Sequence, residues 1–269
     1  MQPQLVLVII ISLIIRRFIT ILLCSSLSIR MTYQERTYRN KVSNKLLVSF
    51  NVSVGETDLF ICSDTDLSEI AFQSVYKYRG FIESYIKYHP SFLTSLKPLD
   101  DDWLAPAIVR DMLKTSFIAD VGPMASVAGA IAEYVGNDLL KQAHNVIVEN
   151  GGDIYLKTES EVRVGVFAGE SPLNYSVNIL LKPEHMPIGV CTSSGTVGHS
   201  LSFGRADAVC VVSKSSAMAD AAATAIGNLV KSKRNIRSAL EKGLNLNGVL
   251  GILIIVGDHF GAIGDIELV

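Results

Sequence analysis

Two short segments carry residue types at spacings that suit a phosphorylated ligand. The first reads Asn150-Gly151-Gly152-Asp153 and follows a predicted strand. Paired glycines let the backbone approach a ligand closely or adopt positive φ, and exposed N–H groups in such a turn can hold a phosphate. Asp153 could then fix a hydroxyl or a ring nitrogen of the ligand. A plain hairpin turn, which Asn-Gly and Gly-Gly favour, explains the same residues, so both interpretations stay open.

The second segment, residues 219–225, is rich in alanine and places Asp220 four residues before Thr224. These two positions share a helix face, so their oxygens can both bind one Mg²⁺, a hard cation that takes a few protein oxygens together with phosphate and water. The alternative is an acid near a helix N-terminus, which the helix dipole favours by about 0.3–1 kcal/mol. In that case Thr224 belongs to a packing face of small residues.

A third segment, residues 192–199, reads Thr-Ser-Ser-Gly-Thr-Val-Gly-His and also follows a predicted strand. Its hydroxyl and N–H groups could bind a pyrophosphate, and His199 could act as a general base. The other interpretation is a polar loop with an exposed histidine. The candidate ligand-binding residues of this segment are Thr192, Ser193, Ser194, Gly195 and Thr196.

Residues 121–129 open a predicted helix with a Gly-Pro pair. The pair leaves the helix N-terminus free to bind an anion. A helix breaker followed by small residues that pack against a neighbouring helix is the alternative.

The composition excludes several classes of partner and site. A formal net charge of -2 gives no general attraction to nucleic acid or to an anionic membrane. The four cysteines are widely spaced without a CxxC pair, so neither a disulfide framework nor a zinc site is expected. This favours a reducing compartment for the protein. The chain has no GxSxG motif, no Walker loop and no Rossmann glycine fingerprint after its first strand.

Residues 1–30 form a hydrophobic N-terminal extension with several interpretations. Residues 5–23 are almost wholly apolar, but Arg16-Arg17 divides them, and two arginines at the centre of a membrane span are costly. A membrane anchor, a cleaved signal peptide and an upstream translation artefact before Met31 all stay open. We expect residues 1–30 to be dispensable for folding and residues 31–269 to form a single domain. The expected localisation is cytoplasmic, or membrane-anchored through residues 1–30.

Hydrophobic periodicity predicts helices first and strands afterwards. The predicted helices cover residues 66–89, 104–119, 124–142, 217–231 and 235–242. The predicted strands cover residues 46–54, 57–62, 145–149, 153–157, 161–168, 176–181, 189–193, 207–213 and 249–256, with residues 91–102 as a loop. Short gaps between the later strands suit antiparallel neighbours. This order predicts an α+β layered fold of mostly antiparallel sheet packed with helices.

The four segments occur in the order, and at about the separations, found in the ApbE family of FAD:protein FMN transferases, which this chain resembles. That family has a small-residue helix start, a strand ending in a Gly-Gly-Asp turn, a Thr-Ser-Gly loop with a downstream His, and an Ala-Asp-x-x-x-Thr-Ala helix. The resemblance covers about residues 121–230. The opening Glu35-Arg-Thr-Tyr-Arg39 and the Thr-Ser-Ser-Gly-Thr-Val-Gly-His-Ser stretch are similar to an uncharacterised ApbE-like branch in archaea and some bacteria.

The resemblance implies a Mg²⁺-dependent transfer of FMN from FAD to a Thr or Ser of a partner protein. Asp220, Thr224 and the backbone carbonyl of Ala125 would match the metal ligands, and His199 the catalytic histidine. The flavin would lie on the residues of the two strand-end segments: Gly151, Gly152, Asp153, Thr192, Ser193, Ser194, Gly195 and Thr196.

The chain also departs from the family pattern. His199 is followed by Ser-Leu-Ser-Phe, so the Asp and Pro of the family's His-x-x-Asp-Pro stretch are absent. Val127 or Ala128 stands where the family has a lysine. Three hypotheses therefore stay open: an FMN transferase, a non-catalytic protein that binds a flavin or another phosphorylated ligand, and a membrane-tethered accessory protein.

Overall fold

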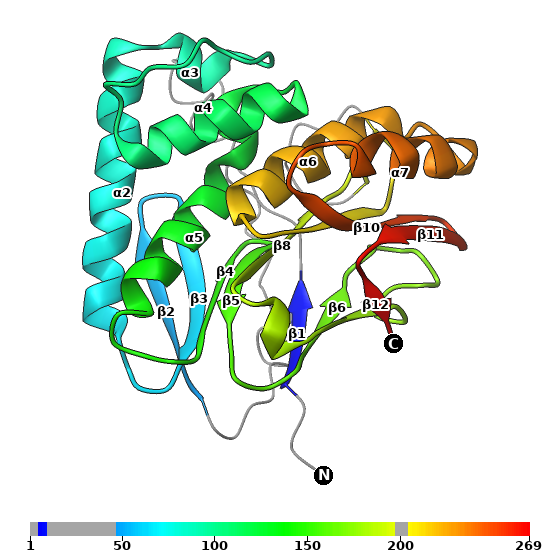
Figure 1. Cartoon of the computed structure of the whole chain (residues 1–269), viewed down its shortest axis with the longest axis horizontal. Coiled ribbons are helices and arrows are strands. Elements are labelled where there is room, and N and C mark those ends of the chain that lie inside the picture. The colour runs from blue at the N-terminus through cyan, green and yellow to red at the C-terminus, as the bar shows by residue number, and fades with distance from the viewer. Residues whose placement is uncertain (1–4, 10–46, 197–203) are drawn as a thin grey trace, which may run out of the picture.

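The middle layer of the molecule is an antiparallel sheet of eight strands. The computed structural model describes residues 5–9, 47–196 and 204–269, in which the strand order is β11-β10-β9-β8-β5-β4-β3-β2 (Figure 1). Every neighbouring pair in this sheet is antiparallel. Its strands are β2 (Val48–Val54), β3 (Thr57–Ser63), β4 (Val146–Asn150), β5 (Asp153–Lys157), β8 (Ile188–Ser193), β9 (Ala208–Ser213), β10 (Val249–Val256) and β11 (His259–Gly264).

A smaller sheet covers one face of the large one. Its order is β1-β6-β7-β12, with β1 parallel to β6 and the other pairs antiparallel. A buried apolar cluster between the sheets joins Ile147, Ile154 and Val190 of the large sheet to Val164 and Ile179 of the small one. The strands are β1 (Leu5–Ile9), β6 (Val162–Val166), β7 (Asn178–Leu181) and β12 (Glu267–Leu268), and a 3₁₀ turn, η3 (Pro183–His185), lies between β7 and β8.

Helices cover the opposite face of the large sheet (Figure 1). One group packs over β2 to β5 and consists of α2 (Ser68–Tyr88), α4 (Ala107–Ala119) and α5 (Val127–Leu139). The other packs over β8 to β10 and consists of α6 (Ser216–Leu229) and α7 (Ile236–Leu244). Short helical segments complete this layer: α3 (Ser91–Thr94), η2 (Pro123–Ser126) and η4 (Lys233–Asn235).

The strands of the large sheet have continuous apolar sequences because their side chains alternate between two buried faces. In β4, Val146 and Val148 face the helices, whereas Ile147 between them faces the small sheet. Successive side chains of a strand point to opposite faces, and here both faces are buried. The large sheet is therefore the common floor on which helix residues and strand-end residues can meet.

The predicted α+β layered fold is confirmed, and most element boundaries differ by one to three residues. The helix predicted from residue 104 begins at Ala107, because Pro106 disfavours helical backbone at the residue before it. The helix predicted from residue 124 is the 3₁₀ turn η2 followed by α5. The loop predicted over residues 91–102 contains the short helix α3, and β1, β11 and β12 are additional to the predicted strands.

The division into residues 1–30 and 31–269 stays a prediction. Within the extension, the structure describes Leu5–Ile9 as strand β1, paired with β6. In the described part of the chain, no single helix is long and apolar enough to cross a membrane, and one bent helix pair, Ala107–Ala119 with Pro123–Leu139, passes that test by length and composition only.

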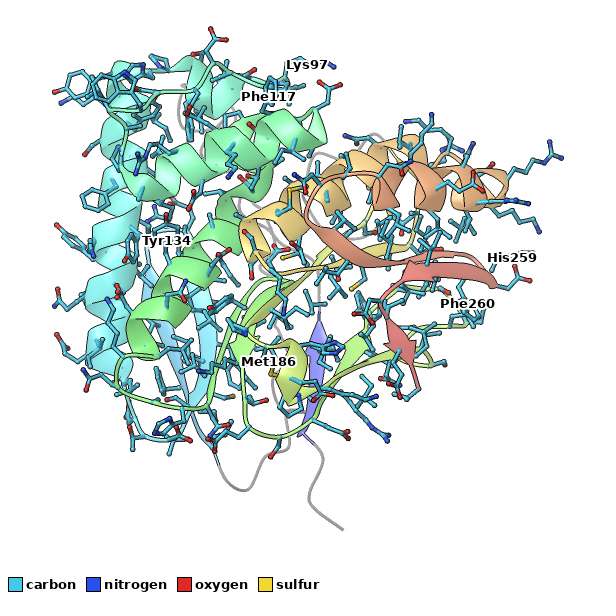
Figure 2. All side chains as sticks on the ribbon, in the orientation of Figure 1. Lys97, Phe117, Tyr134, Met186, His259 and Phe260 are labelled. Carbon is cyan, nitrogen blue, oxygen red and sulfur yellow. The ribbon has the colours of Figure 1, made fainter. Side chains whose placement is uncertain are left out.

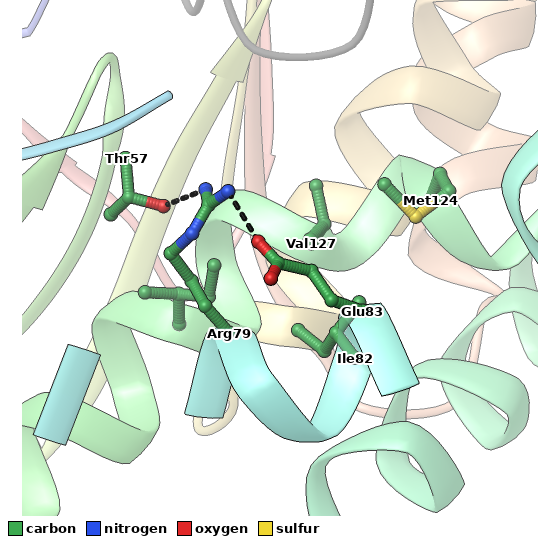
Figure 3. Close-up of a pocket in the computed structure, with 7 residues that line it drawn as sticks. Thr57, Arg79, Ile82, Glu83, Met124 and Val127 are labelled. Atoms are coloured by element: carbon green, nitrogen blue, oxygen red, sulfur yellow. Dashed lines mark hydrogen bonds and ion pairs between the residues drawn. The ribbon is translucent and has the colours of Figure 1, made fainter. Parts of the chain in front are cut away.

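A buried arginine ties the β2–β3 hairpin to α2. Arg79 is 7% exposed and donates to Thr57 Oγ1 at 2.9 Å, to Glu56 Oε2 at 2.6 Å and to Glu83 Oε1 at 2.6 Å. Figure 3 shows the guanidinium between Thr57 and Glu83. The adjoining cavity measures about 10 Å³, which is room for about one water molecule and not for a ligand.

Aromatic side chains hold α5 against α2 and α4. Figure 2 shows Tyr134 on α5, where its ring meets that of Tyr78 edge-on with centroids 5.0 Å apart. Its hydroxyl donates to Asp111 Oδ2 at 2.6 Å. These contacts fix the body of α5, and with it the place of its N-terminus.

The described cysteines behave as small buried side chains. Cys62, Cys191 and Cys210 are buried free thiols. Burial raises the pKa of Cys62 to about 12, and raises the pKa values of the other two as well. These thiols therefore stay protonated and unreactive.

Candidate functional site

The Gly-Gly-Asp segment is the turn between β4 and β5, and it also borders β8. Gly151 and Gly152 adopt φ of 64° and 118°, a region that side chains rarely enter. The Gly152 N–H donates to Glu149 Oε1 at 3.2 Å, and its carbonyl accepts from the Thr192 N–H at 3.2 Å. The hairpin interpretation and the ligand interpretation are thus compatible, because this hairpin lies beside the start of the Thr-Ser-Ser segment.

Three side chains lie next to one another across the ends of these strands. The register pairs Asn150 with Asp153, and Asp153 with Cys191. Two residues along each strand, Val148 and Tyr155 belong to the cluster under the helices, so Asn150 and Asp153 also face the helix layer. Cys191 Sγ donates to the Ser216 carbonyl in α6 at 3.3 Å, which places α6 directly over this strand end.

Asp220 reaches from α6 to the N-terminus of α5. Its Oδ2 accepts from the Gly129 N–H at 3.0 Å, and the Ala128 N–H also binds this carboxylate. The close approach needs glycine, because a Cβ on Gly129 would lie 2.2 Å from the Ser216 carbonyl oxygen. Asp220 is therefore a cross-helix cap for α5, satisfying N–H groups that a helix start leaves unpaired.

Asn150 joins the strand end to the same helix start. Its Nδ2 donates to the Ala128 carbonyl at 3.0 Å. The side chain is fully buried, yet its Oδ1 has no hydrogen-bond partner among the described residues. A buried acceptor without a partner costs about 1–3 kcal/mol, so this oxygen is available to a ligand donor or to a cation.

Two carboxylates of the site, buried Asp153 and partly buried Asp220, lie close enough for their charges to interact. Asp153 is 2% exposed. Its burial, and next the charge of Asp220, raise its pKa well above the ordinary value. Burial also raises the pKa of Asp220 to about 7, against the lowering effect of the hydrogen bonds from Gly129 and Ala128. A positive charge between these groups would relieve both effects.

A second carboxylate caps α6 in return. Glu133, on α5, accepts from Ser215 Oγ at 2.8 Å and from the Ala217 N–H at 3.2 Å. Burial raises the pKa of Glu133, and the hydrogen bonds from Ser215, Ala217 and Ser216 oppose that rise. The first turns of α5 and α6 are thus joined by an acid from each helix.

The Thr-Ser-Ser segment divides between the two faces of the sheet. Cys191 and Ser193 alternate with Thr192, which is paired with Cys210 in the cluster between the sheets. Thr192 Oγ1 is buried beside the Cys210 thiol, a weak partner, and has no other partner among the described residues. Only part of this predicted binding segment therefore faces Asp153 and Asp220.

The end of that segment folds into a turn. Ser194 Oγ donates to the Ala206 carbonyl at 3.3 Å and accepts from the Thr196 N–H at 3.1 Å. Thr196 Oγ1 donates to Asp207 Oδ1 at 2.8 Å, and both Gly195 and Thr196 are exposed. His199, the predicted catalytic residue, lies outside the described residues.

The donor set fits a hard cation such as Mg²⁺. Thr224 lies one turn after Asp220 on the same face of α6 and is partly exposed. Ala125 lies in η2, which packs against α6 and leads directly into the α5 start that Asp220 binds. No group of three or more His, Cys, Asp or Glu side chains suits a metal in the described part of the chain. Hydroxyl and backbone oxygens would have to complete the shell around the carboxylates, as Mg²⁺ accepts.

Several residues of the site carry signals too weak to read in the sequence. Gly129 resembles any helix glycine, although a Gly inside a helix that is not near its end points to close packing. Glu133 resembles a solvent-exposed acid on an apolar helix. Asn150 stands next to the predicted glycine pair, and its link to Ala128 depends on a contact across 22 residues.

A ligand-sized hollow lies further along α6. It measures about 530 Å³, and Asn228 and Leu229 of α6 line it together with Lys97, Asp120 and Lys242. Figure 2 shows Lys97 near Phe117 at the outer edge of the helix layer. None of the described predicted site residues lines this hollow, but Ala225, which directly follows Thr224, does.

The fold and this cluster define an ApbE-like protein. The structure of Pseudomonas stutzeri flavinyl transferase ApbE in its apo form is similar, with a TM-score of 0.55 and 13% identity, covering 81% of this chain and 94% of that one. The flavin transferase ApbE of Vibrio cholerae gives a TM-score of 0.51 at 13% identity, covering 81% and 96%. At this identity the likeness shows a shared fold.

A family model described as "AbpE bacteria" matches residues 39–259, so the chain belongs to this family. It is also 42% identical over 226 residues to a UPF0280 protein of Methanococcus aeolicus, covering 82% of this chain and 91% of that protein. A UPF0280 protein of Methanocaldococcus jannaschii is 46% identical over 225 residues, covering 81% and 91%. The resemblance to an archaeal, uncharacterised ApbE-like branch is confirmed.

Proposed function

We propose that this protein binds FAD together with Mg²⁺ and transfers the FMN moiety to a Thr or Ser hydroxyl of a partner protein. The observation that carries the proposal is the pairing of Asp220 with buried Asp153 at the N-terminus of α5. Buried Asp153 and partly buried Asp220 lie beside an Asn150 oxygen that has no partner among the described residues, which favours a bound cation. Such a cation would attract the phosphates of a nucleotide.

The proposed roles are those that the family resemblance implies for these residues. Asp220, Thr224 and the Ala125 carbonyl hold the cation, which when bound offsets negative charge on the phosphates. The Gly151-Gly152 turn, where no side chain stands in the way, and residues 192–196 border the nucleotide. The acceptor hydroxyl oxygen bonds to the phosphorus of the FMN half, the bond from that phosphorus to the AMP oxygen breaks, and AMP leaves. His199 takes the proton of the hydroxyl.

A second candidate function is non-catalytic binding of a flavin or of another phosphorylated ligand. One observation favours it: Val127 or Ala128 stands where the family has a lysine, and each of these apolar side chains is 4% exposed within the core. The site therefore has no cation of its own at that position to stabilise a leaving phosphate. Binding needs the metal ligands alone, whereas transfer also needs a base and leaving-group stabilisation.

The test uses the full-length protein with FAD, with and without Mg²⁺. Titration calorimetry on the wild type should show Mg²⁺-dependent FAD binding, which Asp220→Asn removes and the exposed-site control Asp101→Asn retains. Release of AMP from FAD in the presence of a Ser/Thr-containing protein fraction, lost in His199→Ala, supports transfer. Binding without AMP release supports the non-catalytic alternative. Absence of Mg²⁺-dependent binding of both FAD and FMN rejects the flavin proposal.

A further inference from the structure

The first turns of α5 and α6 lie side by side and run in opposite directions. Gly129 approaches Ser216 and Asp220 of α6. Glu133, one turn further along α5, binds Ser215 and Ala217 at the start of α6. Each helix thereby presents a carboxylate to the N–H groups at the start of the other. The first four N–H groups of any helix lack partners within the helix. Here each of the two helices supplies an acid that caps the other.

We propose that Glu133 is a positioning residue for Asp220, and so for the cation site; this inference rests on the proposed function. Glu133 binds the N-cap residue Ser215 through Oγ and the first-turn N–H of Ala217. Ser215 Oγ also accepts from the Met218 N–H at 3.3 Å. Glu133 thus fixes the first turn of α6, both its rotation about the helix axis and its position along that axis. Asp220 lies one turn later on α6, so its position depends on this turn.

The same network extends to the strand that carries Asp153. Ser216 Oγ donates to the Ile154 carbonyl at 3.0 Å, and Gly189 approaches Ser216 so closely that a Cβ would lie 2.5 Å from its Cα. The start of α6 is therefore held from α5 by Glu133 and from the sheet by Ser216. Loss of the Glu133 carboxylate leaves α6 free to shift relative to α5, and a displaced Asp220 binds a cation less well.

Full-length variants and Mn²⁺, followed by the electron paramagnetic resonance signal of the free ion, test this role. Mn²⁺ shares the preference of Mg²⁺ for carboxylate, carbonyl and water oxygens. Glu133→Ala should weaken Mn²⁺ binding about tenfold, as loss of outer partners of metal ligands does. Glu133→Gln keeps one acceptor oxygen, so its Mn²⁺ affinity should fall only about threefold. The exposed-site control Glu184→Ala should bind as the wild type does.

A double-mutant cycle separates positioning from general destabilisation. If Glu133 acts through Asp220, Glu133→Ala adds no further loss to Asp220→Asn. Wild-type affinity in Glu133→Ala, or losses that add in the double variant, overturns the inference. If Glu133→Ala does not fold, the same comparison is made with Glu133→Gln in the wild-type and Asp220→Asn backgrounds. Loss in Asp220→Asn but not in the Glu133 variants rejects the positioning role alone, whereas wild-type affinity in Asp220→Asn rejects the metal site as well.

Discussion

The Asp220 carboxylate accepts a hydrogen bond from the Gly129 N–H at 3.0 Å, across 91 residues of sequence. This contact gives Asp220 two functions, as a cap of α5 and as the proposed cation ligand. Asp220 lies beyond the first turn of α6, so the dipole of its own helix contributes little to stability. The cross-helix cap raises the expected structural contribution, so substitutions at this position must separate folding from binding.

Asp220→Asn should keep the fold and lose the response to the cation. Asparagine retains an acceptor oxygen for the Gly129 N–H, so the free energy of unfolding should change by less than about 1 kcal/mol, whereas Asp220→Ala should lose about 1–2 kcal/mol. Urea denaturation measures both. The rise in melting temperature that Mg²⁺ with FAD produces in the wild type should be absent in Asp220→Asn. A full rise in that variant would contradict the assignment.

Gly129→Ala should separate α5 from α6. The added Cβ would lie 2.2 Å from the Ser216 carbonyl oxygen and 2.9 Å from Asp220 Cβ, so the helices must move apart. We expect a loss of about 1–3 kcal/mol in unfolding free energy. Gly80→Ala is the matched control, since a Cβ there meets nothing within 4 Å in the middle of α2. That control should gain about 0.5–1 kcal/mol, and equal effects of the two substitutions would refute the close-packing argument.

Asp64 should make stability depend on acid pH. Its carboxylate accepts from the His144 and Asn145 N–H groups at 2.7 and 2.9 Å and from Asn145 Nδ2 at 2.8 Å. Partial burial alone would raise the pKa of Asp64, but these hydrogen bonds hold it below the ordinary value of 3.8. The stabilisation is therefore complete above pH 4 and is lost as pH falls through the lowered folded-state pKa.

Asp64→Asn should accordingly be less stable than the wild type at pH 7, by about 1–2 kcal/mol. The difference should shrink as the pH falls below 4 and vanish once the wild-type carboxylate is protonated in both states. Denaturation by urea at a series of pH values measures this, with Asp101→Asn as an exposed control. A difference that is constant with pH would show that the charge of Asp64 contributes nothing.

Arg79→Met should be far more destabilising than Arg237→Met. Arg79 is buried and pairs with Glu56 and Glu83 at 2.6 Å each, and those two side chains are 20% and 48% exposed. Its loss leaves the buried Thr57 hydroxyl and the Glu56 carboxylate without their donor, which costs about 1–3 kcal/mol. Arg237 makes a similar pair with Glu241 at 2.9 Å, but its side chain is 92% exposed. An exposed pair one helical turn apart contributes about 0.3–0.5 kcal/mol. Similar losses in the two variants would show that burial of Arg79 is unimportant.

The fold class, most elements and the order of the site segments can be predicted from local patterns in the sequence. Period-two and period-3.6 patterns report burial directly, because the side chains that alternate are the ones that pack. Gly151-Gly152 as a turn and Asp220 on a helix follow from such local rules. Even the start of α4 at Ala107, three residues later than predicted, follows from a local rule, because Pro106 disfavours helical backbone at the residue before it.

Which of these residues lie in contact depends on the tertiary structure. Asn150, Asp153 and Asp220 come together because β4, β5 and β8 are neighbours, and because Gly129 lets α6 approach α5. The reciprocal caps of Glu133 and Asp220 join residues more than 80 positions apart. No local pattern encodes such pairs, since each acid by itself looks like an ordinary polar residue on a helix. Their desolvation and raised pKa values exist only once the layers have closed over them.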